Sequence, residues 1–236
     1  MKHLWYILPL LFILSCEDSK CDVELWGECY SIEDTHFLDL GNTQLTGEIP
    51  PQIGQLINLD TLILNVNQLT GSIPSEIGNL INLKRLILHG NQLTGSIPSE
   101  IGNLKNLTQL SLGSNQLTGS IPPEIWNIKT MKNLSLSDNQ LTGSIPSEIS
   151  NMKNLEHLIL SLNQFDGEIQ WVDNLNNLTM LNLDNNQFSG KIPDSICDIC
   201  EKRQGNVNTG YNKFCPPYPE CCNNNLGNYQ DTSNCG

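Results

Sequence analysis

The chain is poor in aromatic residues and in basic residues. Phe, Trp and Tyr make up 6% of its 236 residues, although 38% of the residues are hydrophobic. This favours a core of Leu and Ile over a globular core built on bulky rings. Lys and Arg number 12 against 25 Asp and Glu, which gives a formal net charge of −13. Such an excess of acid opposes binding to nucleic acid and to anionic membrane surfaces.

Residues with catalytic chemistry are also scarce. After the first 20 residues the only histidines are His36, His89 and His157, and none has a serine or cysteine at a motif-like spacing. The chain has neither a phosphate-binding glycine loop nor an HExxH motif. We therefore predict that the protein is not an enzyme and that it uses no cofactor and no metal.

Cysteine is absent from the whole middle of the chain, between Cys29 and Cys197. Eight of the nine cysteines lie near the two ends of an exported chain, which predicts a disulfide framework there. Cys21 and Cys29 bracket a short segment and are expected to pair, while the other six allow fifteen pairings. A zinc site that includes the CxxC of Cys197 and Cys200 is the weaker alternative. The expected disulfide cysteines are Cys21, Cys29, Cys197, Cys200, Cys215, Cys221, Cys222 and Cys235.

A repeat of about 24 residues fills the middle of the chain. Its pattern is LxxLxLxxNxLTGxIPxxIGxL, and successive Asn residues are spaced by 24, 24, 24, 24 and 23. Self-similarity at this fixed period indicates a solenoid, in which each unit buries its apolar face against its neighbours. The repeated Asn residues are Asn67, Asn91, Asn115, Asn139, Asn163 and Asn186.

The sequence pattern of each unit predicts a short strand, a loop and a short helical turn. Leu62, Ile63 and Leu64 alternate inward and outward, as in a strand, and seven such strands would form a parallel sheet. The Asn that follows is expected to bond loop backbone groups of its own and the neighbouring turn. Gly71 and its equivalents are expected to supply a special backbone angle, and the Pro that follows precedes a helical turn with an acidic residue.

The LTGxIPxxIGxL half of the unit resembles the plant-type class of leucine-rich repeats. This class includes receptor-kinase ectodomains and polygalacturonase-inhibiting proteins. The resemblance implies an α/β repeat solenoid: a right-handed curved stack of about seven repeats with a concave parallel sheet and convex helical turns and loops. It assigns residues 37–196 to the repeats, residues 21–36 to an N-terminal cysteine cap and residues 197–236 to a C-terminal cap. The tail of the chain, from YNKFCPP to QDTSNC, is similar to that of exported bacterial members.

The N-terminus has the composition of an export signal. Lys2 is followed by an apolar stretch too short to span a membrane as a mature helix. The ILSC sequence resembles a bacterial lipobox, so residues 1–15 are expected to be a signal peptide, Cys16 a lipid anchor and residues 16–20 a tether. An ordinary secretory signal cut after Ser15 is the alternative. Three NxS/T sequons, at Asn106, Asn133 and Asn177, matter only in a eukaryote.

A ligand is expected on the concave face, since such faces form the extended binding surfaces of solenoids. Three outward Ile residues are unusual on a face that solvent should wet, although β-branched residues also favour strands in general. Trp126 and Trp171 are expected to fill altered convex loops, with a convex contact as the alternative. The predicted ligand-binding residues are Ile63, Arg85, Ile87, His89, Gln109, Ser111, Asn133, His157 and Ile159.

These features predict an exported, lipid-anchored protein that binds another macromolecule on its concave face. The expected ligand is a protein, a peptide or a glycan, with contact to the membrane only through the lipid. Two other functions remain open: a structural or adhesive surface protein, favoured by the uniform repeats, and an inhibitor of a secreted glycosidase, implied by the resemblance.

Overall fold

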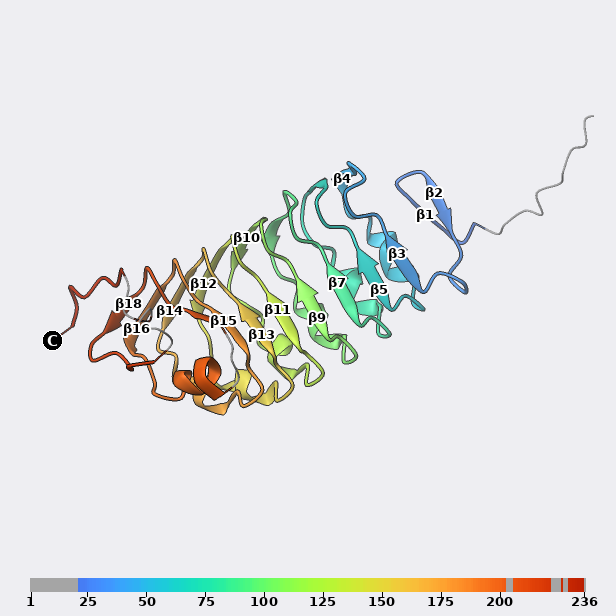
Figure 1. Ribbon diagram of the computed structural model, residues 1–236. Coiled ribbons are helices and arrows are strands. Elements are labelled where there is room, and N and C mark those ends of the chain that lie inside the picture. The colour runs from blue at the N-terminus through green and yellow to red at the C-terminus, as the bar shows by residue number, and fades with distance from the viewer. Residues whose placement is uncertain (1–20, 203–205, 222–225, 227–228, 236) are drawn as a thin grey trace, which may run out of the picture.

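The computed structural model describes residues 21–202, 206–221, 226 and 229–235. Short strands stack side by side along the length of the molecule, from the N-terminal hairpin to the C-terminal cap (Figure 1). The hairpin consists of β1 (Val23–Leu25) and β2 (Glu28–Tyr30), which pair antiparallel, and β1 packs on the first helical turn. Among the residues that the structure describes, no helix is long and apolar enough to cross a membrane.

The concave sheet has eight parallel strands, one more than the sequence predicts. Each contributes an inward residue to the core, and Leu38, Leu62 and Leu86 lie directly opposite one another in register. The strands are β3 (Phe37–Asp39), β5 (Thr61–Ile63), β7 (Arg85–Ile87), β9 (Gln109–Ser111), β11 (Asn133–Ser135), β13 (His157–Ile159), β15 (Met180–Asn182) and β17 (Asn206–Asn208).

The eighth strand, β17, comes from the segment expected to be only a cap. Leu181 pairs with Val207 across a step of 26 residues, so the extra residues are accommodated outside the sheet. Asn212 then occupies the position of the repeated Asn and is almost fully buried. Sequence analysis missed this unit because its strand, NVN, lacks the leucine pattern and its spacing departs from 24.

A second run of parallel strands, which the sequence analysis did not predict, lies along another side of the stack (Figure 1). It is built from the QLTGS segments, whose alternation of exposed Gln and Thr with a buried Leu is itself a strand pattern. Its members are β4 (Thr46–Glu48), β6 (Gln68–Thr70), β8 (Thr94–Ser96), β10 (Gln116–Gly119), β12 (Gln140–Ser144), β14 (Gln164–Gly167), β16 (Gln187–Lys191) and β18 (Lys213–Cys215).

The convex turns are short 3-10 helices, as expected, and most begin after a proline in extended conformation. In the shortened repeat Ile169 replaces that proline and has a different backbone conformation, with φ −115° and ψ 22°. The helices are η1 (Pro51–Gln55), η2 (Ser75–Asn79), η3 (Ser99–Asn103), η4 (Pro123–Asn127), η5 (Ser147–Asn151) and η6 (Gln170–Asn174), with a π-helical turn η7 (Asp198–Lys202) in the cap.

The Asn ladder is confirmed. The Asn91 side chain accepts the Leu69 N–H at 3.1 Å and donates to the carbonyls of Leu64 and Leu88 at 3.0 and 2.9 Å. It therefore bonds both its own turn and the preceding one, which leaves few buried backbone groups unpaired. At the first rung Thr43 makes a shorter-range bond, from its hydroxyl to the Leu40 carbonyl.

The disulfides lie at the two ends of the stack. Cys21 pairs with Cys29, as predicted, and the cap contains the pairs Cys197–Cys221 and Cys215–Cys235. Cys200 is also disulfide-bonded, so the CxxC belongs to the disulfide framework. Cys16 and Cys222 lie outside the described residues.

Aromatic residues gather at the C-terminal end of the core. Phe165, Phe188 and Phe214 replace the leucine of the second strand and stack in sequence, with ring centroids 6.3 and 6.4 Å apart. Trp126 and Trp171 are buried in the convex layer, in agreement with the expectation that they fill altered loops.

Candidate functional site

The concave sheet presents three columns of outward side chains, because alternate residues of each short strand point away from the core. In the N-terminal half, two pairs of these side chains bond to each other. The Arg85 Nε donates to the Gln109 side-chain oxygen at 3.2 Å, and the Ser111 hydroxyl lies 3.2 Å from the His89 Nδ1. The predicted polar residues of this half thus form two cross-strand pairs.

The expectation that Ile87 is an exposed apolar group is wrong. Its side chain lies outside the main core cluster yet is only 6% exposed. It stands between Ile63 and Ser111 on the neighbouring strands, and Arg85 and His89 lie two residues before and after it along the chain. Packing on the surface of the sheet therefore buries it, even though it points away from the solenoid interior.

The exposed apolar groups near this face lie elsewhere. Val66 and Leu162, which immediately precede the ladder Asn, are 49% and 50% exposed and have positive φ angles of 53° and 56°. Large side chains seldom adopt this left-handed conformation. Phe37, at the edge of the sheet, is 59% exposed.

A central depression of about 300 Å³ brings together five of the nine predicted residues. Asn133 contributes a buried side-chain oxygen that has no hydrogen-bond partner among the described residues, which is costly for a polar atom. The half-buried side chains that line this depression are Gln109, Ser111, Asn133, Ser135, His157 and Ile159, of which only Ile159 is apolar. The other predicted residues, Ile63, Arg85, Ile87 and His89, lie on the N-terminal side of it.

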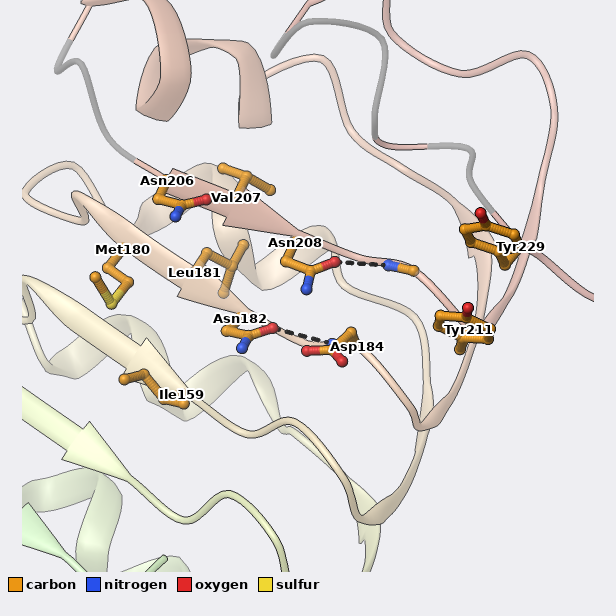
Figure 2. A pocket seen from close by; sticks show the side chains of 11 residues that line it. Ile159, Met180, Leu181, Asn182, Asp184, Asn206, Val207, Asn208, Tyr211 and Tyr229 are labelled. Atoms are coloured by element: carbon orange, nitrogen blue, oxygen red, sulfur yellow. Dashed lines mark hydrogen bonds between the residues drawn. The ribbon is translucent and has the colours of Figure 1, made fainter.

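A larger hollow, of about 480 Å³, lies at the C-terminal end of the same sheet. Figure 2 shows it over β13, β15 and β17, with Tyr211 and Tyr229 at the end where the strands finish. The two tyrosine rings stack with centroids 4.7 Å apart and planes 4° apart, and they are 53% and 72% exposed. Of the nine predicted residues, only Ile159 lines this hollow.

Sequence reasoning missed this hollow because half of it comes from the eighth strand and the tail. Tyr211 occupies the same left-handed position as Val66 and Leu162, with φ 51°, and Asn212 follows it as the ladder residue. The YN pair of YNKFC was therefore a detectable signal. The contact with Tyr229, 18 residues later, was not.

The shifted pKa values belong to the caps. Burial raises the pKa of Tyr218, and burial together with nearby Glu28 raises the pKa of Tyr30. Hydrogen bonds from Ser233 lower the pKa of Asp231. Among the described residues, no group of three or more His, Cys, Asp or Glu side chains could hold a metal ion.

Comparison with known proteins identifies the fold family. A family profile for the leucine-rich repeat region matches residues 71–199, more than half of the chain, and single leucine-rich repeats match residues 35–56 and 58–80. No curated protein matches the sequence.

Solved structures of plant receptor ectodomains are similar to this chain. The Arabidopsis receptor kinase HAESA, in complex with the peptide hormone IDA and the co-receptor SERK1, is 39% identical over 77% of this chain, with a TM-score of 0.72. A TDR receptor is 35% identical over 76%, with a TM-score of 0.71. The ectodomain of GASSHO1/SCHENGEN3 from Arabidopsis thaliana, in complex with CASPARIAN STRIP INTEGRITY FACTOR 2, is 35% identical over 72%, with a TM-score of 0.67.

The match covers only part of those receptors, between 20% and 31% of their chains. The family profiles cover residues 35–56, 58–80 and 71–199, which contain the repeat pattern, most strands of the concave sheet and the 3-10 helices that follow them. The chain therefore belongs to the leucine-rich repeat family, and its repeats are of the plant receptor type.

Proposed function

We propose that the protein is exported, is anchored by a lipid on Cys16 and binds a protein or peptide along its concave face without catalysing a reaction. The main support is the likeness to HAESA, whose ectodomain was solved with a bound peptide hormone. A rigid stacked sheet suits this function, because a preorganised surface loses little conformational entropy when it binds.

Two observations support export and anchoring. Disulfides persist mainly in oxidising compartments, and all seven cysteines among the described residues are disulfide-bonded. With nine cysteines in total, at least one has no partner within the chain. We assign this role to Cys16, because the ILSC sequence accounts for a modified thiol there.

The anchor is tested by intact mass spectrometry of the protein extracted from membranes. A mature N-terminus at Cys16 that carries diacylglycerol is the expected result. If the protein is recovered from the medium with an unmodified N-terminus, the lipid anchor is wrong, although export is not.

The central depression is the proposed centre of the peptide site. It lies midway along the sheet, and the Asn133 side-chain oxygen in it has no hydrogen-bond donor among the described residues. Once the Asn133 side chain turns toward the ligand, a peptide N–H group could supply that donor. The Arg85–Gln109 pair at its N-terminal side adds a cation beside this surface. An extended peptide that crosses several strands would contact these groups together.

The test uses peptides selected from a random library on the full chain. Ser135→Trp fills the depression with a bulky side chain and is expected to weaken peptide binding at least about tenfold. Ser147→Trp is the matched control, since Ser147 is exposed on the convex helix η5.

Thermal melts of both variants show whether the fold survives. Loss of peptide binding in the Ser147→Trp variant with normal binding in the Ser135→Trp variant would place the ligand on the convex side and refute the proposed site. Failure to select any peptide would count against peptide binding as the function.

A further inference from the structure

We propose that the hollow at the C-terminal end of the concave sheet binds a neutral oligosaccharide. This site is separate from the central depression and shares only Ile159 with it. Its volume of about 480 Å³ falls within the range of small-molecule sites, roughly 300–1,000 Å³. It lies over β15 and β17 (Figure 2), and four of its lining residues, Asn206, Asn208, Tyr211 and Tyr229, are exposed, so a chain of sugar units could reach it from solvent.

Side-chain amides supply the polar surface of the hollow. Asn206 is exposed, and Figure 2 shows no hydrogen bond between its side chain and the other residues that line the hollow. The Asn208 oxygen accepts the Gly210 N–H at 3.2 Å, which orients the amide and leaves its nitrogen as a donor. The Asn182 oxygen accepts the Asp184 N–H at 3.3 Å, and its nitrogen donates one of its two N–H groups to the Ser161 hydroxyl at 3.3 Å.

These groups match the chemistry of sugar hydroxyls. A primary amide both donates and accepts, and a carboxylate accepts, so neighbouring groups of this kind can each bond a different hydroxyl of one sugar ring. Asp184 provides the carboxylate, and Figure 2 shows it between the amides and the tyrosine pair. Asn206, Asn208 and Asn182 thus present donors and acceptors along one side of the hollow.

The tyrosine pair supplies an apolar platform. Stacking joins one face of each ring to the other, and both rings remain more than half exposed. The face of an aromatic ring carries negative charge density, which attracts the C–H groups of a pyranose ring. Tyr211 also holds a left-handed backbone conformation that Gly or Asn would adopt at lower cost. The presence of a tyrosine there therefore points to a role for its side chain.

Charge favours a neutral sugar over an anionic ligand. Among the described residues no Lys, Arg or His lines the hollow, and its one charged group is the Asp184 carboxylate. The chain as a whole carries a net charge of −13. An acidic glycan or phosphorylated ligand would therefore be repelled.

The experiment measures binding of neutral hexasaccharides to the full chain by saturation-transfer NMR and calorimetry. The probes are cellohexaose, xylohexaose, mannohexaose and chitohexaose, with hexagalacturonate as the acidic comparison. At least one neutral probe is expected to bind, and Asn206→Ala should weaken it about tenfold with an unchanged melting temperature. Tyr229→Leu should also weaken it, whereas Tyr229→Phe retains the stacked ring and should retain binding.

Gln164→Ala, an exposed change on the second sheet, is the control and should have no effect. Absence of binding by all neutral probes at about 10 mM would overturn the proposal, as would binding that is indifferent to Asn206→Ala. Preference for hexagalacturonate, or a selected peptide that occupies the hollow when no sugar does, would also overturn it. The Ser135→Trp variant should bind the sugar normally, which keeps this proposal distinct from the peptide site.

Discussion

At the scale of single residues, the repeated Asn has the clearest physical role. The Asn139 side chain accepts the Leu117 N–H at 2.9 Å and donates to the carbonyls of Leu112 and Leu136, both at 3.1 Å. One side-chain amide thus bonds backbone groups of two adjacent turns, and these backbone groups have no partner in either sheet. This gives a physical reason for the recurrence of Asn at this position along the stack.

Replacing Asn139 with Ala is therefore expected to lower the free energy of unfolding by about 2–4 kcal/mol, since it leaves several buried backbone groups unpaired. Urea denaturation followed by circular dichroism measures the change. Gln140→Ala, at the adjacent exposed position, is the control and should alter stability little. Equal stability of the two variants would contradict the ladder's role.

Ile87 shows that an outward-pointing residue need not be accessible. Because its side chain is only 6% exposed, Ile87→Asp is expected to destabilise the protein by about 2 kcal/mol through burial of a charge. Ile87→Val should cost less than about 1 kcal/mol. Thermal melts of both variants test this, and an unchanged melt for Ile87→Asp would show that the charge reaches solvent.

At the scale of elements, the spacing of the convex helices depends on one position in each. A Cβ added at Gly102 would lie 2.4 Å from the Glu124 Cβ and 2.9 Å from the Glu124 backbone, so glycine permits the close approach of η3 and η4. The equivalent residue in η4 is the buried Trp126, and η4 and η5 pack less closely. The size of this residue thus sets how tightly neighbouring turns stack.

Gly102→Ala is accordingly expected to destabilise the protein by about 2 kcal/mol, because the backbone of the next turn must move. Gly119→Ala is the matched comparison. Its added Cβ would meet only the Ser96 Cβ, at 3.8 Å, so the strain of φ +77° alone should cost about 1 kcal/mol. Denaturation midpoints rank the two variants, and the reverse order would mean that the turns can separate freely.

At the scale of the whole molecule, the end units have a neighbour on one side only and need other support. The Cys197–Cys221 bridge spans 24 residues around β17, and the Thr209 hydroxyl bonds the Leu226 carbonyl. Phe214 extends the aromatic stack into the same unit. The eighth unit is thus held by covalent and local contacts where stacking ends.

The double change Cys197→Ser and Cys221→Ser is expected to lower the free energy of unfolding of this end of the chain by about 3 kcal/mol. Because each unit contacts mainly its neighbours, β17 should exchange its amide hydrogens faster while the central strands keep their protection. Hydrogen exchange with mass spectrometry measures this segment by segment. Uniform loss of protection along the stack would show that the solenoid unfolds as one unit.

The sequence alone determined the periodic part of this protein. The leucines, Asn67 and its equivalents and Gly71 recur because every internal turn has the same environment, so a local pattern suffices to predict the strand, the ladder and the helical turn. The Cys21–Cys29 bridge was predictable for a similar reason, since its partners lie close along the chain.

The tertiary structure alone decided the features that depend on contacts between different turns. The burial of Ile87 arises from side chains on three strands. The C-terminal hollow requires β17, whose sequence departs from the repeat, and the contact between Tyr211 and Tyr229, which the cap brings together. Such features have no period and no short-range signal, because they are set by which side chains meet once the units have stacked.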